Sequence, residues 1–310
     1  MHPVLLQGQG VTIQRPARSA GTAIGLGASG LALALSLALL ARGLGWPVSW
    51  PQFVAYAGAG VMLAVAATFA FWAWACATMR YIVSAAGITI RWGPIRHHIP
   101  ISRIQLMIRG KGEERPRVRG VSWFGYHVGR GEVGDEKRVL FFSTHRVPED
   151  IVYIRTQDAI YAVSPQDTSR FITDSQKAYE ASQDDAPAGP LVERDFVSAH
   201  PIWSDRVAQM LMLATVALNV ALWAYIFANY PDMSNEITIE FPPIGAITTL
   251  DSRDAIFRIP GTASAVLGVN LVASLLFQPR ERAATYLLLS GTIFLQVVFW
   301  VAAVAAVVNA

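Results

Sequence analysis

The sequence predicts a membrane α-helical bundle of about five transmembrane helices together with an all-β domain that one C-terminal helix closes. Two observations predict this fold class. Between residues 77 and 207 the apolar residues follow short, strand-like runs. A helix needs about 17–25 apolar residues to cross a hydrocarbon core about 30 Å thick, and five stretches meet that length: 21–41, 53–77, 207–228, 261–277 and 283–308. The hydrophobic fraction of 53% and the mean hydropathy of +0.37 agree with several spanning helices.

The first two stretches predict a two-helix membrane anchor over 1–79. The first is longer than the 7–15-residue apolar core typical of a cleaved signal peptide, and no cleavage site follows it. Cys76 is the one cysteine, so an intrachain disulfide and a cysteine-based zinc site are both excluded.

The distribution of charge predicts which side of the membrane each segment faces. Basic residues flank the first pair of helices on the side of the β domain, whereas the segment between the third and fourth helices is mainly acidic. Because cytoplasmic loops carry the excess of Lys and Arg, we expect the N-terminus and the β domain to be cytoplasmic and the C-terminus to lie outside. The basic residues that decide this are Arg15, Arg18, Arg80, Arg91 and Arg96.

The predicted spans contain almost no ionisable side chains, which argues against an ion or proton pathway within one chain. Small and polar residues instead indicate helix packing. Asn219 and Asn270 are expected to hydrogen-bond between the third and fourth helices. The small-residue positions are Gly21, Gly25 and Ser29 in the first helix and Ser264 and Gly268 in the fourth. Their partner is another helix of the chain, a second copy or another protein.

The segment 80–182 predicts a small antiparallel barrel or sandwich. The expected strands are 81–84, 88–92, 95–99, 104–109, 123–128, 138–143, 151–155 and 160–163. Ser164 is then the expected N-cap of a helix with Pro165 at its first position, and Phe171, Ala178 and Tyr179 give that helix an apolar side. A polar, proline-rich linker is expected over 183–204.

Several motifs of this segment resemble the bacterial PH-domain membrane proteins. They are Gly87-Ile-Thr-Ile-Arg-Trp-Gly-Pro94, Ile99-Pro-Ile-Ser-Arg-Ile104, Phe142-Ser-Thr144 and Ile160-Tyr-Ala-Val-Ser-Pro165 leading to Phe171. The resemblance covers about residues 21–182. It implies a pleckstrin-homology-like barrel with a C-terminal helix, preceded by an apolar helix pair in a bacterial plasma membrane.

The segment 205–310 predicts a three-helix membrane region with an extracytoplasmic loop at 229–260. Residues 207–280 resemble a bacterial membrane domain of unknown function through Tyr230-Pro231, Ile237-Thr-Ile-Glu-Phe241 and Asp251-Ser-Arg253. Glu240 stands where that family typically has a histidine.

The run 109–119 is the strongest candidate binding site, because it holds five basic residues among two glycines and a proline. Basic side chains near an anionic leaflet each contribute about 1 kcal/mol of binding. The alternatives are a solvated hairpin tip and a docking surface for an acidic protein. The basic residues are Arg109, Lys111, Arg115, Arg117 and Arg119.

No catalytic, cofactor-binding or metal-ligating set stands out in the sequence. His97 and His98 alternate across a strand, which is poor geometry for one metal. The glycine-rich segment 125–134 lacks the Gly-Lys-Ser/Thr of a phosphate-binding loop. We therefore expect a non-enzymatic scaffold or accessory subunit whose cytoplasmic domain binds a protein partner. An anionic-lipid-sensing module is the alternative, a membrane enzyme is a third reading, self-association stays open, and no nucleic-acid partner is expected.

Overall fold

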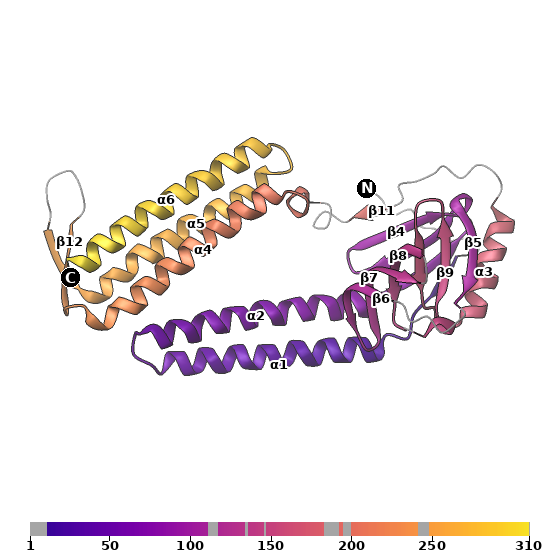
Figure 1. Ribbon diagram of the computed structural model, residues 1–310, viewed down its shortest axis with the longest axis horizontal. Coiled ribbons are helices and arrows are strands. Elements are labelled where there is room, and N and C mark those ends of the chain that lie inside the picture. Colours follow the sequence, from indigo (N-terminus) through magenta and orange to yellow (C-terminus); the bar gives the residue numbers. More distant parts are fainter. Residues whose placement is uncertain are drawn as a thin grey trace. The chain divides into compact units, whose positions relative to one another are not determined.

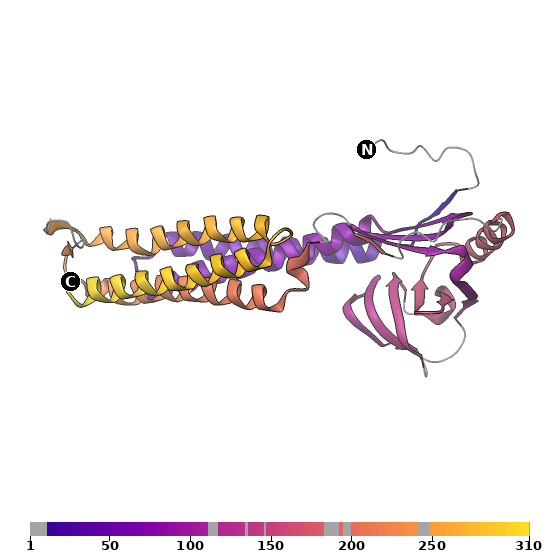
Figure 2. The same cartoon turned by 90° about the horizontal axis from the view of Figure 1, so that it is seen from above.

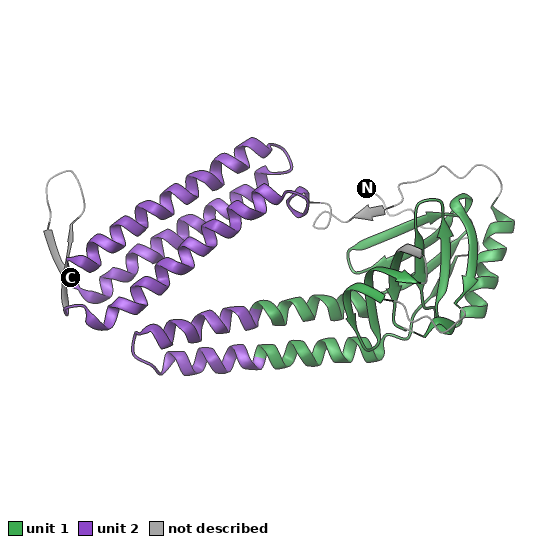
Figure 3. Ribbon diagram, viewed as in Figure 1, with its two compact units in different colours: residues 1–33, 64–198 green, residues 34–63, 199–310 purple. Residues whose placement is uncertain are grey.

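The computed structural model divides into two compact units, which Figure 3 shows in separate colours. The first comprises Met1–Leu33 and Ala64–Ser198, and the second comprises Ala34–Leu63 and Ala199–Ala310. The boundary passes through two long helices that therefore belong to both units. The residues that the structure describes are 11–110, 117–133, 136–145, 147–182, 192–194, 200–240 and 248–309.

Five long helices are apolar enough to cross a membrane, as the sequence predicts. Each contains an 18-residue window whose mean hydropathy lies between 1.6 and 2.3. Asp205 caps the third of them, since its Oδ1 accepts a hydrogen bond of 3.1 Å from the Ala208 N–H. The helices, labelled in Figure 1, are α1 (Ser19–Leu44), α2 (Trp50–Ala77), α4 (Arg206–Asn229), α5 (Arg258–Phe277) and α6 (Arg282–Val308).

The first unit contains two sheets, seen as separate layers in Figure 2. The five-stranded sheet is antiparallel throughout, in the order β1-β2-β3-β4-β11. Gly93, with a φ of +52°, makes the tight turn between β3 and β4. The strands of this sheet are β1 (Thr12–Gln14), β2 (Arg80–Ser84), β3 (Gly87–Trp92), β4 (Ile95–Pro100) and β11 (Val192–Arg194).

The six-stranded sheet has the order β5-β9-β10-β8-β7-β6, so strands that are consecutive in sequence, β5 and β6, form its two opposite edges. Strand β10 pairs with β8 in parallel and with β9 in antiparallel. The strands of the six-stranded sheet are β5 (Ile104–Arg109), β6 (Arg117–Trp123), β7 (Tyr126–Val133), β8 (Glu136–Ser143), β9 (Val152–Thr156) and β10 (Ile160–Val163).

Three expectations about these strands are corrected by the structure. The sheets are not closed into a barrel, because the 3-10 turn Ile101–Arg103 separates β4 from β5 and those strands do not pair. The strands are not all antiparallel, because β9 and β10 form a hairpin whose second strand enters beside β8. The single strand expected at 123–128 is wrong, because residues 124–125 turn the chain from β6 into β7.

The closing helix α3 (Thr168–Ala181) begins three residues later than expected, at Thr168 and not at Pro165. Asp167 is the N-cap, and its Oδ1 accepts a hydrogen bond of 2.9 Å from the Arg170 N–H. Ser164 is instead fully buried at the end of β10, where its Oγ accepts a hydrogen bond of 2.8 Å from the Thr144 N–H. A tertiary contact of Ser164 therefore outweighs the local capping pattern and shifts the start of the helix.

One apolar core fills the space between the two sheets and α3. Tyr81 crosses this core: its hydroxyl donates to the Phe142 carbonyl at 2.6 Å and accepts from the Ser164 N–H at 3.2 Å. Burial raises the pKa of the Tyr81 phenol. Phe171 packs its ring on that of Tyr81, with centroids 6.1 Å apart. A second apolar cluster lies on the opposite face of the six-stranded sheet and includes Val139, Phe141, Ile151, Tyr153 and Ala162.

In the second unit α4, α5 and α6 pack around a buried core that includes Leu222, Ile226, Ile256 and Ala263. Between α4 and α5 the chain forms an antiparallel pair, β12 (Glu236–Glu240) with β13 (Thr248–Ser252). The Tyr230 hydroxyl donates to the Asp254 carboxylate at this end of the helices.

Candidate functional site

A groove with a volume of about 420 Å³ lies between the edge strand β5 and α3 in the first unit. Ile104 and Met107 pack inward on the core. Leu106 and Ile108 point outward and are 47% and 45% exposed. Residues from the 3-10 turn, β5 and α3 line the groove: Ile101, Ile104, Gln105, Leu106, Met107, Ile172, Ser175, Gln176, Tyr179 and Glu180.

The backbone along the outer side of β5 has no strand partner among the described residues. A register shift between Ile104 and Leu106 breaks the regular alternation of β5 against β9. An unpaired strand edge presents a row of N–H and C=O groups to any added strand. The groove therefore combines main-chain hydrogen-bonding groups with exposed apolar side chains.

Charge at this groove is low among the residues that the structure describes. Glu180 is the one charged residue among the described residues that line it. Arg103, in the turn before β5, pairs with Asp158 at 3.6 Å. Arg109, the last residue of β5, donates from its Nε to the Glu149 carbonyl at 2.6 Å. The groove is suited to an apolar segment with little charge of its own.

The structure separates the predicted basic residues rather than gathering them. Arg109 lies on β5, whereas Arg117 and Arg119 lie on β6 at the opposite edge of the sheet. Lys111 and Arg115 lie outside the described residues. Arg130 faces Arg119 across the β6–β7 pair, and all three β6–β7 arginines are exposed. Figures 1 and 2 show β6 and β7 on the side of the domain from which α1 and α2 extend.

The predicted small residues of α1 pack within the first unit. A Cβ on Gly21 would lie 2.2 Å from the Gly125 carbonyl oxygen, and a Cβ on Gly25 would lie 2.9 Å from the Ala73 Cβ. Ser29 donates from its Oγ to the Ala66 carbonyl at 2.9 Å. These positions bring α1 against α2 and against the β6–β7 turn, which favours packing within the chain.

The predicted polar residues of the C-terminal helices also make interhelical contacts. Ser264 of α5 donates to the Asn219 Oδ1 of α4 at 3.0 Å, and the Asn219 Nδ2 donates to Gln296 of α6 at 3.3 Å. Asn270 bonds to Thr292 of α6 at 2.9 Å, not to α4. Gly268 has open space where its Cβ would be. Asn219 and Ser264 therefore form one network, and Gly268 lies outside it.

A buried carboxylate that the sequence reasoning missed lies at the other end of these helices. The Asp205 Oδ2 accepts hydrogen bonds from Gln278 at 3.1 Å and Tyr286 at 2.9 Å. The Ala208 N–H and then these side chains hold the pKa of Asp205 below its ordinary value. Its signal in the sequence was an aspartate directly before an apolar run, the pattern of an N-cap. The cluster ties the start of α4 to the adjoining ends of α5 and α6.

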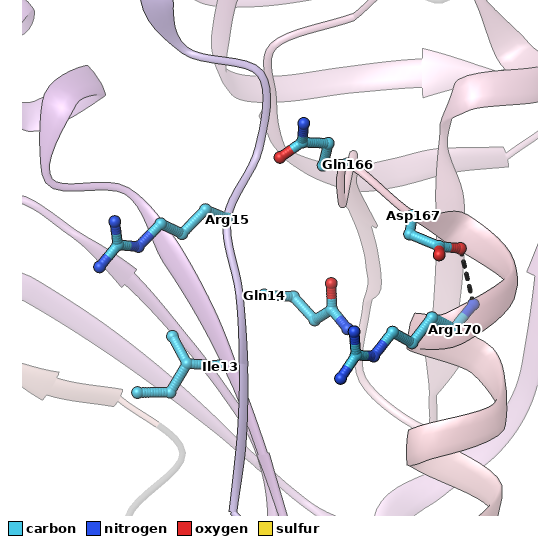
Figure 4. A pocket seen from close by; sticks show the side chains of 6 residues that line it. All are labelled: Ile13, Gln14, Arg15, Gln166, Asp167 and Arg170. Carbon is cyan, nitrogen blue, oxygen red and sulfur yellow. Dashed lines mark hydrogen bonds between the residues drawn. The ribbon is translucent and has the colours of Figure 1, made fainter.

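A second hollow of about 290 Å³ lies between β1 and the start of α3. Figure 4 shows Gln14 pointing toward α3, while Ile13 and Arg15 point to the other side of the strand. The Gln14 side chain donates to Asp174 at 3.2 Å, and Arg170 pairs with the same carboxylate at 3.8 Å. These contacts fasten β1 to α3. Among the described residues, no group of three or more His, Cys, Asp or Glu side chains is placed to hold a metal ion.

The comparisons with known proteins bear on the first unit. Residues 79–178 match the family model of a bacterial PH domain, which confirms the resemblance over β2 to α3. No curated protein and no solved structure matches the chain. The resemblance of residues 207–280 to a membrane domain of unknown function stays a prediction.

Proposed function

We propose that this chain is a non-enzymatic integral membrane scaffold or accessory subunit whose PH-like domain binds a protein partner. The observation that carries the proposal is the groove between β5 and α3. Edge strands beside an apolar groove recognise extended peptides by adding them to the sheet, with main-chain bonds for affinity and side-chain pockets for specificity.

The groove fits such a peptide in three respects. The outer edge of β5 offers the hydrogen bonds. Leu106 lines the groove, and Ile108 lies two residues further along β5 on the same outward side, which matches the alternation of an added strand. Tyr179, which is 63% exposed on α3, supplies the opposite wall. The partner is therefore an extended, mainly apolar segment of another protein.

The placement of the domain follows from charge. Arg15, Arg18 and Arg80 flank α1 and α2 at the end that carries the domain. With five spans, the positive-inside rule puts the N-terminus and the PH-like domain in the cytoplasm and the C-terminus outside the plasma membrane. The domain is then held at the membrane surface, where a partner meets it.

A photoreactive amino acid at Leu106 tests the proposal in the full chain in native membranes. We expect irradiation to give a discrete cross-linked protein. The same amino acid at Val147, which is 52% exposed away from the groove, is the matched control. No adduct from position 106, or the same adducts from both positions, would refute the groove as the binding site.

A second candidate function is anionic-lipid binding, favoured by the basic β6–β7 edge. Arg117, Arg119 and Arg130 are exposed there, and none forms an ion pair with another described residue. In nanodiscs of mixed lipid composition, anionic lipid should be enriched around the chain and the enrichment should fall with salt. Arg117→Ser with Arg119→Ser should remove the enrichment, whereas unchanged enrichment would exclude this edge as the lipid site.

A further inference from the structure

The β6–β7 turn exposes a large aromatic side chain beside the start of a membrane helix. Phe124, at its tip, is 77% exposed. The next residue, Gly125, has a φ of +80° and lies so close to α1 that a Cβ would sit 2.7 Å from the Gly21 nitrogen. Trp123, before the tip, donates from its Nε1 to the Gly21 carbonyl at 3.0 Å. The turn is therefore fixed against α1, and Phe124 at its tip is largely exposed.

The lengths of α1 and α2 locate this turn relative to a bilayer. The helices have 26 and 28 residues, and a hydrocarbon core about 30 Å thick takes up about 20 residues at 1.5 Å each. Counted from the loop-side ends of the apolar stretches, that length runs from Ala41 back to Thr22 and from Phe53 on to Trp72. The remaining residues of both helices lie at the domain end. The hydrocarbon boundary at this end thus falls near Thr22 and Trp72.

Trp123 contacts both helices close to this level. Its Cζ2 lies 3.3 Å from where a Cβ on Gly25 would be, and its ring centroid lies 5.9 Å from that of Phe69. Trp72 joins them, with its ring centroid 6.0 Å from that of Trp123. Trp and Tyr concentrate at membrane–water interfaces, where an apolar ring meets a polar edge. At the loop end of the same helices, Trp46 and Trp50 occupy the corresponding level.

We propose that the tip of the β6–β7 turn is a membrane-contact site, with Phe124 inserted into the interfacial region of the leaflet beside the domain. The occupant is the lipid surface, because the exposed Phe124 lies between Trp123 and Gly125, both of which contact α1 near the hydrocarbon boundary. The inference rests on the membrane placement in the proposed function. It adds a third point of attachment to the two helices, so the domain is held in one orientation.

A nitroxide spin label at position 124 tests this in lipid vesicles of phosphatidylcholine and phosphatidylglycerol. The full chain with Cys76→Ala carries the label through Phe124→Cys. Matched variants carry it through Val61→Cys, exposed in the middle of α2, and Val147→Cys, exposed on the domain. Relative to the label at 147, we expect the label at 124 to be relaxed much less by a water-soluble nickel chelate and more by oxygen. The label at 61 should behave in the same way as the label at 124.

The outcomes separate this inference from the membrane placement. A lipid-protected label at 61 with a water-exposed label at 124 would overturn the inference alone. Water exposure at both would overturn the membrane placement as well. A label at 124 protected from both relaxants would show a protein or a second copy over the turn, which also overturns the inference.

The unsubstituted chain gives an independent measurement that needs no variant. Vesicles containing a phospholipid with a diazirine near the head of its acyl chain should label peptides that include residues 120–128. Peptides that include residues 147–156 should stay unlabelled. Absence of label from the first set, with label present in peptides of α2, would overturn the inference.

Discussion

Gly21 is the point at which α1 meets the PH-like domain, so Gly21→Ala is expected to weaken that contact. The added Cβ would lie 2.2 Å from the Gly125 carbonyl oxygen, and real Cβ atoms essentially never show contacts under 3.0 Å. The obstructing atom belongs to the backbone, so no side-chain rotation relieves the clash. The β6–β7 turn must therefore move away from α1.

The size of the effect follows from three contributions. Inserting a methyl group into a well-packed contact costs about 1–3 kcal/mol. Loss of the hydrogen bond from Trp123 to the Gly21 carbonyl costs about 0.5–1.5 kcal/mol. Alanine favours the helix over glycine by about 1 kcal/mol, which offsets part of this cost. The contact should weaken by about 0.5–3.5 kcal/mol, which is about 2- to 400-fold in its equilibrium constant.

Hydrogen exchange of peptides from residues 120–128, in the detergent-solubilised full chain, measures this local opening. Gly27→Ala is the matched control, because it lies in the same helix and its Cβ would meet nothing within 4 Å. Exchange should accelerate by the stated factor in Gly21→Ala and stay unchanged in Gly27→Ala. Equal exchange in both variants would refute the reasoning.

Two further substitutions, one in each unit, test the buried hydrogen bonds of the protein. Tyr81→Phe removes the hydroxyl that bonds to the buried Ser164 N–H and Phe142 C=O. The domain should therefore lose about 1–3 kcal/mol of stability. A denaturation midpoint by near-ultraviolet circular dichroism that equals the wild type would contradict this. Asn219→Leu breaks the network that joins α4, α5 and α6 and should cost about 0.6–1.7 kcal/mol in an SDS titration. Gly268→Ala, which meets open space, should cost nothing, and a loss as large as that of Asn219→Leu would show that the network contributes little.

The long helices and several strands followed from local pattern alone. Apolar runs of membrane length have few alternative structures, so all five helices were predictable to within a few residues of their ends. Strand β10 (Ile160–Val163) was also predictable, since β-branched and aromatic residues lie between turn signals there.

The errors arose where a distant contact decides the structure. The aromatic residues of the segment 123–126 predict a strand. In the structure Gly125 turns the chain there, because Gly21 of α1 lies against it. The local pattern predicts Ser164 as an N-cap, but in the structure Ser164 is buried and hydrogen-bonds to Thr144 and Tyr81. Neither partner is close in sequence.

The candidate site was harder to predict for the same reason. Leu106 and Ile108 look like ordinary core residues of a strand, and only the register shift in β5 turns them outward. The basic run 109–119 looks like one loop, but the sheet order sends Arg109 and Arg119 to opposite edges. Both outcomes depend on strand pairing, which sequence periodicity does not specify.

The sidedness of the two ends of the chain tests the account most directly. Single cysteines in the Cys76→Ala background, at Val147 in the domain or at Asn309 after α6, would be treated with a membrane-impermeant maleimide in intact spheroplasts. Five spans with a cytoplasmic domain predict labelling at 309 in intact spheroplasts and labelling at 147 only after lysis. Labelling of 147 in intact spheroplasts, or protection of both positions until lysis, would contradict the account.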